Sequence, residues 1–376
     1  MPGILTRYVF KEIIVPFLLS LGIFTATALL SKVVKLVELA VVYGAGVPFL
    51  ARFVASVIPS FLIYTIPISF LVAVLAAFTR LSSDSELTAM KASGMSLFTL
   101  MKPVMAVAAV VSVCALFVTL YAFPWGNLSL KRLVFDASKQ ALVSGVEEKT
   151  FYDRFKGLTL YVDHVTPGTG EMEGIFIAEE TKGGEPNTFF AARGVMAAPE
   201  NGSSVYLKLY DGAVHRQSAE KGYYNIAAFS TYMVELDTGS PETMLASRTN
   251  RELYAGELAM KAADMRSRGE DPAGIIIDMH KRFVLPVSVL LFALMGVPLG
   301  IQKVRGTRFT GFTIALGVVL LYYVASTAFE ALGEHSSINP VLAVWASTII
   351  FFLAGAYIFF RAAKDAPLLP RFISGR

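Results

Sequence analysis

Charge and cysteine are scarce in this chain of 376 residues. Only 16% of the residues are charged, whereas soluble domains carry about 25%. This shortage excludes disorder and a charged coiled coil as descriptions of the whole chain, and it disfavours a purely soluble enzyme. The single cysteine, Cys114, excludes an intrachain disulfide and a zinc site built on cysteines. The net charge of +4 is too small and too scattered to indicate nucleic-acid binding.

Charge is absent above all from six apolar runs of 19 to 27 residues, none of which contains Asp, Glu, Lys, Arg or His. About 17–25 apolar residues suffice for a helix to cross the hydrocarbon core. The runs therefore predict six transmembrane helices, three before and three after a long polar insert. Prolines within the runs predict kinks whose freed carbonyls are satisfied by neighbouring helices. The runs are residues 13–31, 53–79, 103–123, 283–301, 309–329 and 340–360.

Lysine and arginine in the short loops predict the orientation, because cytoplasmic loops are enriched in them. The tails and the loops on their side hold twelve, and the short loops on the other side hold three, so both termini are expected in the cytoplasm. Ala26-Thr27-Ala28 resembles a signal-peptide cleavage site, but the long apolar stretch around it favours an uncleaved first span. The twelve are Arg7, Lys11, Arg80, Lys91, Lys102, Lys303, Arg305, Arg308, Arg361, Lys364, Arg371 and Arg376; the three are Lys32, Lys35 and Arg52.

The insert between the two membrane halves (1–123 and 283–376) changes to a polar composition. Alternating apolar residues between turn signals predict several short strands in residues 124–247, arranged as a sandwich or jelly roll. Residues 248–282 return to helical composition, and Asp271-Pro272 is typical of a helix start. The predicted fold is an α-helical membrane protein with an inserted all-β, jelly-roll-like domain. The strand segments are 159–162, 174–178, 188–192, 204–210 and 223–236; the turn signals are Pro167-Gly168, Gly183-Gly184, Asn201-Gly202 and Asp211-Gly212.

No motif for catalysis is present. The chain has no Walker A, GxSxG, HExxH or GxGxxG pattern, and its four histidines lack metal-ligand spacing. The spans contain no ionisable residue for a proton relay, which disfavours a proton-coupled transporter and an intramembrane protease. We therefore expect no enzyme activity and no metal or cofactor bound by this chain.

The loop after the second span predicts a short helix over residues 83–94. Ser83 and Glu86 have the spacing of a capping box, Leu87 and Met90 share a helix face, and Gly94 is suited to end the helix. Two interpretations remain open: a connector lying on the membrane, or a helix that docks on a cytoplasmic partner through Glu86.

Lys32, Lys35 and Arg52 form a basic cluster at the outer membrane boundary. They could anchor the helix ends by snorkelling, or bind an anionic headgroup or phosphate. Two other polar segments have simpler explanations: the cations after Val297-Pro298-Leu299-Gly300 follow from topology, and Glu330 and Glu334 suit a solvated turn.

Several motifs resemble those of the lipopolysaccharide-export permeases of the LptF/LptG type. The most specific is Ser85-Glu86-Leu87-Thr88-Ala89-Met90-Lys91-Ala92-Ser93-Gly94, which is similar to the coupling helix of that family. The arrangement of three spans, a β domain and three spans matches from end to end. The other matching segments are Arg7-Tyr8 with Glu12, Lys32-Val33-Val34-Lys35, Ile66-Pro67-Ile68-Ser69, His280-Lys281-Arg282-Phe283 with Pro286, and, closer to the LptF side of the family, Val297-Pro298-Leu299-Gly300 and Gly333-Glu334 with Asn339-Pro340.

The resemblance implies a subunit of an ABC transporter in the inner membrane. Such permeases form a heterodimer with an LptG-type subunit, bind a cytoplasmic ATPase dimer that holds the ATP, and pass lipopolysaccharide through a periplasmic jelly roll to a bridging protein with one membrane helix. It further implies that Ser85, Glu86, Leu87, Met90 and Gly94 couple to the ATPase. Lys32 and Lys35, with Arg52 beside them, would face the phosphorylated lipid. The alternative is a membrane-anchored interaction or assembly scaffold without transport.

Overall fold

The computed structural model describes residues 2–42, 46–144, 148–155, 158–166, 171–179, 187–197, 205–217, 224–236, 247–301, 310–335 and 338–364. The chain divides into two compact units. The first comprises Met1–Leu36, Ala51–Leu130 and Thr249–Arg376 and is helical; the second comprises Val37–Leu50 and Lys131–Arg248 and contains the β sheet. Each unit is described by itself.

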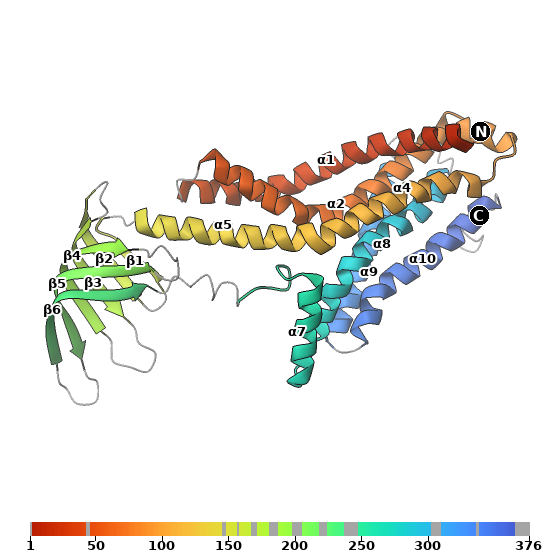
Figure 1. The fold of residues 1–376 in the computed structure, drawn as a ribbon. Coiled ribbons are helices and arrows are strands. Elements are labelled where there is room, and N and C mark those ends of the chain that lie inside the picture. Colours follow the sequence, from red (N-terminus) through yellow and green to blue (C-terminus); the bar gives the residue numbers. More distant parts are fainter. Residues whose placement is uncertain are drawn as a thin grey trace, which may run out of the picture. The chain divides into compact units, whose positions relative to one another are not determined.

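Six long helical segments of the described chain have the length and apolar composition to cross a membrane. Five of them contain a predicted apolar run in full, and the remaining one, which begins at Phe312, contains all but the first three residues of the run 309–329. The predicted class of six-span helical membrane protein is therefore confirmed. Figure 1 shows the long helices α4, α8, α9 and α10 running lengthwise together. The helices are α1 (Pro2–Val42), α2 (Val47–Ser83), α3 (Glu86–Ala92), α4 (Leu97–Phe117), the π-helical turn η1 (Val118–Ala122), α5 (Phe123–Ser144), α7 (Ala255–Ser267), α8 (Ala273–Ile301), α9 (Thr310–Glu334) and α10 (Pro340–Ala363).

The proline in the middle of α8 is accommodated by a neighbouring helix. Pro286 has no N–H, so it cannot bond the carbonyl of Arg282 one turn earlier. The hydroxyl of Thr119, in the π-helical turn, donates to that carbonyl at 2.8 Å. Ser112 on α4 likewise donates to the carbonyl of Pro286 at 2.8 Å. A neighbouring helix thus satisfies the carbonyl that Pro286 frees, as the sequence predicted.

Glycine allows α8 to approach α2 closely. A Cβ added at Gly300 would lie 2.8 Å from the Cβ of Phe78, and one added at Gly296 would lie 2.8 Å from Cγ1 of Val74. These separations are shorter than carbon atoms tolerate. The four-residue spacing places both glycines on one face of α8. The Pro-Leu-Gly segment therefore serves the packing of two membrane helices.

The segment after the third span differs from the prediction. Residues 124–144 were assigned to the β domain, but they form helix α5, which continues from α4 through the π-helical turn. Gly126 lies against α2, where an added Cβ would approach the carbonyl oxygen of Ser56 to 2.5 Å. A glycine is thus required at this position by contact between helices. At the other end of the insert, the carboxylate of Asp271 accepts the N–H of Ala273 at 2.9 Å, in agreement with the predicted helix start.

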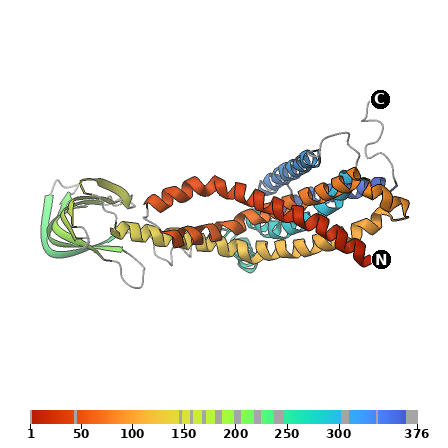
Figure 2. The ribbon, with the colours of Figure 1, turned by 90° about the horizontal axis from the view of Figure 1, so that it is seen from above.

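Six antiparallel strands form one sheet in sequential order, and Figure 2 shows that the sheet is strongly curved. Its apolar side chains line up across neighbouring strands: Leu160 pairs with Ile177, and Ile177 pairs with Phe189. These residues belong to a cluster of buried side chains that gives the sheet its own core. The strands are β1 (Phe151–Phe155), β2 (Leu158–Val165), β3 (Glu171–Glu179), β4 (Asn187–Ala197), β5 (Val205–Gln217) and β6 (Tyr224–Leu236).

The inserted antiparallel domain is confirmed, with two differences in detail. The sequential order is that of a meander, and the crossovers of a true jelly roll do not occur among the described strands. Asp211-Gly212 is not a turn between strands, because β5 runs through it with a left-handed residue, Asp211 (φ 54°). The other three turn signals, at 167–168, 183–184 and 201–202, lie outside the described residues.

Candidate functional site

The predicted helix in the loop after α2 is present as α3, but it begins differently. Helix α2 continues through Ser83, so this residue cannot cap the next helix. The residue before α3 is Ser85, which is left-handed (φ 58°) and makes no capping bond through its side chain. Glu86 is thus the first residue of α3, not its third. The predicted capping box is wrong.

The end of α3 agrees with the prediction. Gly94 has φ 86°, a conformation that glycine adopts without strain. Its N–H donates to the carbonyl of Lys91 at 3.0 Å, and the N–H of Met95 donates to the carbonyl of Met90 at 3.1 Å. These two bonds form a Schellman motif, which satisfies the last carbonyls of a helix. The loop is therefore a defined helical element.

One face of α3 is anchored in the helical unit and the other is open. Leu87 is only 4% exposed and belongs to the apolar core of the unit, against which Met90 also packs. Thr88, Ala89 and Ala92 are exposed and small. A partner that contacted α3 would thus meet a surface of small side chains, whereas Leu87 holds the helix in place.

Glu86 is bound within the chain. The hydroxyl of Tyr8, near the start of α1, donates to its carboxylate. Nearby, Arg80 at the end of α2 donates to the carboxylate of Glu12 at 2.7 Å and also pairs with Asp84 at 3.4 Å. The first turns of α1 are therefore joined to α3 and its loop. The prediction assigned no role to Tyr8 or Glu12, because this contact links residues 78 positions apart.

Only part of the predicted basic cluster can be described. Lys32 on α1 and Arg52 on α2 are exposed. The side chain of Lys35 lies outside the described residues, as do Lys303, Arg305, Arg308, Arg371 and Arg376 of the orientation argument. Lys32 and Arg52 are therefore accessible to a ligand. That the basic cluster binds lipid stays a prediction.

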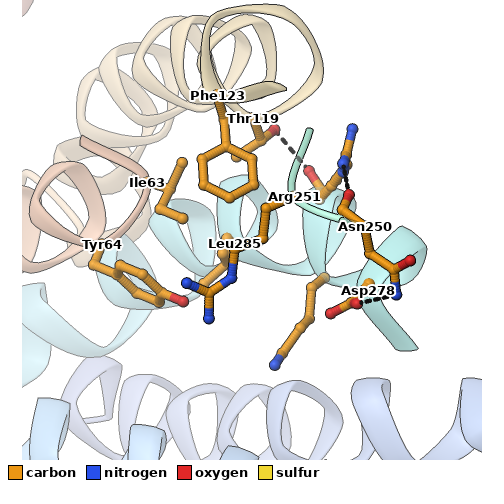
Figure 3. Close-up of a pocket in the computed structure, with 10 residues that line it drawn as sticks. Ile63, Tyr64, Thr119, Phe123, Asn250, Arg251, Asp278 and Leu285 are labelled. Carbon is orange, nitrogen blue, oxygen red and sulfur yellow. Dashed lines mark hydrogen bonds between the residues drawn. The ribbon is translucent and has the colours of Figure 1, made fainter. Parts of the chain in front are cut away.

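A second polar region lies where α8 meets α2, the π-helical turn, the start of α5 and the segment before α7. Figure 3 shows its pocket, which has a volume of about 80 Å³. Arg282 is 4% exposed, and its Nη2 donates to the carbonyls of Asn250 and Leu253 at 2.9 and 2.5 Å. The amide of Asn250 also donates to Asp278 at 2.8 Å. The pocket is lined by Ile63, Tyr64, Thr119, Phe123, Asn250, Arg251, Asp278, Lys281, Arg282 and Leu285.

Glu330 is not in a solvated turn. Its side chain is 17% exposed and binds Nζ of Lys281 at 2.7 Å, which joins α9 to α8. The sequence prediction missed this pair and the role of Arg282. The sequence did contain one signal for this polar region: two adjacent cations, Lys281 and Arg282, stand directly before an apolar run. Cations at a membrane boundary need either a partner or contact with solvent.

The remaining polar pairs suggest no catalytic site. Nδ1 of His164, at the end of β2, lies 2.5 Å from the carboxylate of Glu148. The N–H of Val165 and the side chain of His164 both bond Glu148 and lower the pKa of its carboxyl group. Among the described residues, no group of three His, Cys, Asp or Glu side chains could hold a metal ion.

These features define a multi-pass membrane protein with an inserted antiparallel β domain. The model of the family "Lipopolysaccharide export system permease LptF/LptG" matches residues 7–361, so the chain belongs to this family. The family is one of transport permeases and not a class of enzymes.

Relatives similar to the chain include LptF proteins. The "Lipopolysaccharide export system permease protein LptF" of Escherichia coli is 22% identical over 361 residues, which cover 93% of this chain and 92% of the relative. LptF of Shigella flexneri gives the same values. An uncharacterized protein of Rickettsia prowazekii is 21% identical over 358 residues, covering 94% of this chain and 97% of the relative. The predicted resemblance, including its LptF side, is confirmed.

Proposed function

We propose that this chain is a permease subunit of an ABC-type lipopolysaccharide exporter in the inner membrane. It pairs with an LptG-type subunit and is driven by a cytoplasmic ATPase dimer that binds the ATP. It withdraws the lipid from the outer leaflet and passes it, through its periplasmic β domain, to a single-span bridging protein, which serves biogenesis of the outer membrane. Both termini are cytoplasmic in this proposal. Family membership and the six membrane helices support it.

The main observation in support of the proposal is the structure of α3. A helix of seven residues, anchored by Leu87 and ended by a Schellman motif, presents an open face at the membrane boundary. The chain lacks a Walker A motif, so an energy source must be a partner. In this proposal Ser85, Glu86, Met90 and Gly94 shape the surface that the ATPase contacts, and Leu87 supports it from below.

The coupling role can be tested with Glu86→Ala. We expect this variant to insert normally into the membrane but to retain less ATPase on purification and to export less lipid. Asp84→Ala is the matched control, because it removes an exposed carboxylate from the same loop. Normal ATPase copurification and export by Glu86→Ala would contradict coupling. Absence of any Walker A protein from the wild-type purification would favour the scaffold alternative.

The lipid role of the basic cluster has a separate test. Replacement of both Lys32 and Lys35 by Glu is expected to lower the amount of lipopolysaccharide that copurifies, because like charges repel the phosphates of the lipid. Lys364→Glu, after α10, changes a lysine that this proposal places at the other membrane boundary and serves as a control. Unchanged lipid in the double variant would leave the two lysines with an anchoring role.

A further inference from the structure

The pocket shown in Figure 3 contains a buried cation with an unused hydrogen-bond donor. Nη2 of Arg282 is satisfied by two backbone carbonyls, and its guanidinium lies 5.9 Å from the ring centre of Phe123. Its Nη1 is buried and has no partner in the part of the chain that the structure describes. Buried polar groups are nearly always paired, and a buried charge needs a counter-charge. Within the described residues, Arg282 is therefore incompletely satisfied.

Cations also outnumber carboxylates in the lining of this pocket. Lys281 is balanced by Glu330, and Asp278 accepts a bond from Asn250. The carboxylate of Glu257 on α7 accepts the N–H of Tyr254 at 2.6 Å, and the negative charges of Glu257 and Asp278 both act on Arg282. Arg251 is exposed and joins Arg282 in the lining; Figure 3 shows its side chain reaching toward Tyr64. The lining itself therefore carries more cations than carboxylates, and Arg251 and Nη1 of Arg282 are the cationic groups in it that could bind an anion.

The size and depth of the pocket restrict its ligand. A volume of 80 Å³ admits a group of several heavy atoms, since one water needs about 10–15 Å³ by the same measure. Tyr64 precedes the end of α2 at Ser83 by 19 residues, which is about 29 Å along a helix. That length is close to the thickness of the hydrocarbon core, about 30 Å. The pocket therefore lies at the headgroup level of the membrane boundary opposite α3.

We propose that this pocket binds a phosphate group of a membrane lipid, through Nη1 of Arg282 and the guanidinium of Arg251. Two guanidinium groups match the several acceptor oxygens of a phosphate. The apolar lining by Ile63, Phe123 and Leu285 suits the glycerol or sugar to which the phosphate is joined. The site is separate from the predicted cluster of Lys32, Lys35 and Arg52. The inference that the phosphate belongs to a lipid rests on the proposed membrane function, whereas the inference of an anion site does not.

The test measures binding of radiolabelled phosphatidic acid, in micelles of an uncharged detergent, to the purified full-length chain with its copurifying subunits. Diacylglycerol, which lacks the phosphate, is the reference lipid. We expect Arg251→Gln to weaken phosphatidic acid binding about tenfold, as is typical for the loss of a charged hydrogen bond. Arg251 is exposed, so its variant should fold. Arg266→Gln, an exposed cation on α7 outside the pocket, should bind like the wild type.

Each outcome of this experiment either supports or overturns the proposed site. Equal binding by wild type, Arg251→Gln and Arg266→Gln, or equal binding of phosphatidic acid and diacylglycerol, would overturn the site. Complete displacement of the lipid by millimolar inorganic phosphate would assign the pocket to free phosphate and overturn the lipid source; weak displacement supports the headgroup. The assay contains no ATP and no export step, so failure of the proposed export function would leave its result unchanged.

Discussion

The two ends of the helical unit hold their charges in different ways. At the α3 end, Arg80 is exposed and pairs with Glu12 and Asp84, and Glu86 receives the hydroxyl of Tyr8. At the other end, Arg282 is buried and held by two backbone carbonyls. Exposed ion pairs rearrange at little cost, whereas a buried charge fixes its surroundings. The first end is therefore suited to docking and movement, and the second to holding the segment before α7 against α8.

The largest effect on stability is expected from Arg282→Met. Methionine keeps most of the apolar stem but leaves the carbonyls of Asn250 and Leu253 without their donor. Each unsatisfied buried group costs about 1–3 kcal/mol, so the loss of the donor to two carbonyls should lower the free energy of unfolding by about 2–6 kcal/mol. Denaturant unfolding of the detergent-solubilised chain measures it, with Arg251→Met as the control for the charge. An unchanged or higher stability would mean that burying the charge costs more than its bonds contribute.

A smaller loss is expected from Thr119→Val. The variant removes the hydroxyl that donates to the carbonyl freed by Pro286, while the volume of the side chain stays the same. The free energy of unfolding should fall by about 1–2 kcal/mol. Thr119→Ser keeps the hydroxyl and should retain most of the stability. If valine and serine behaved alike, packing of the π-helical turn, and not this bond, would hold α4 against α8.

The same contrast explains what the sequence could and could not predict. The six spans and five of the strands followed from apolar runs and from alternation, which depend on neighbours in the chain. Helix α5 was missed because the change to polar composition after residue 123 placed it in the β domain, whereas in the structure α5 continues from the third span and Gly126 allows its contact with α2. Similarly, Asp211-Gly212 is a turn signal that a long strand overrides.

The candidate sites also differ in whether local or distant residues determine them. The helix that carries Glu86 was predicted because its residues and its terminal Gly94 are local signals. Its first residue was not, since Ser83 is taken up by the end of α2. The bonds of Arg282 depend on segments about 30 and 160 positions away in the chain, and no local pattern indicates them. Periodicity therefore identified the elements, but not the tertiary bonds between them.

At the α3 end we expect Tyr8→Phe to alter coupling more than stability. Only the hydroxyl is lost, and water can replace it at the half-buried carboxylate of Glu86, so stability should fall by about 1 kcal/mol or less. The carboxylate would lose the contact that orients it. We expect reduced stimulation of the partner ATPase by lipid, with normal copurification of the ATPase. Tyr121→Phe, an exposed tyrosine of the π-helical turn, is the control. If lipid stimulated the ATPase of the Tyr8→Phe variant as in the wild type, the contact between Tyr8 and Glu86 would be structural only.

The smallest effect is expected from Arg80→Gln. Arg80 is 56% exposed, so water and salt screen its charge in both pairs, although its partner Glu12 is only 16% exposed. The unfolding transition should not shift measurably, and any small shift at low salt should disappear at high salt. Lys281→Gln provides the contrast at the other end, because Lys281 is only 34% exposed and its charge is screened less; the two carboxylates, Glu330 and Glu12, are buried to a similar degree. Arg80→Gln could instead destabilise the chain as much as Lys281→Gln does, at every salt concentration. The α3 end would then be as rigidly held as the Arg282 end. The docking surface would have to move together with α1 as one rigid body.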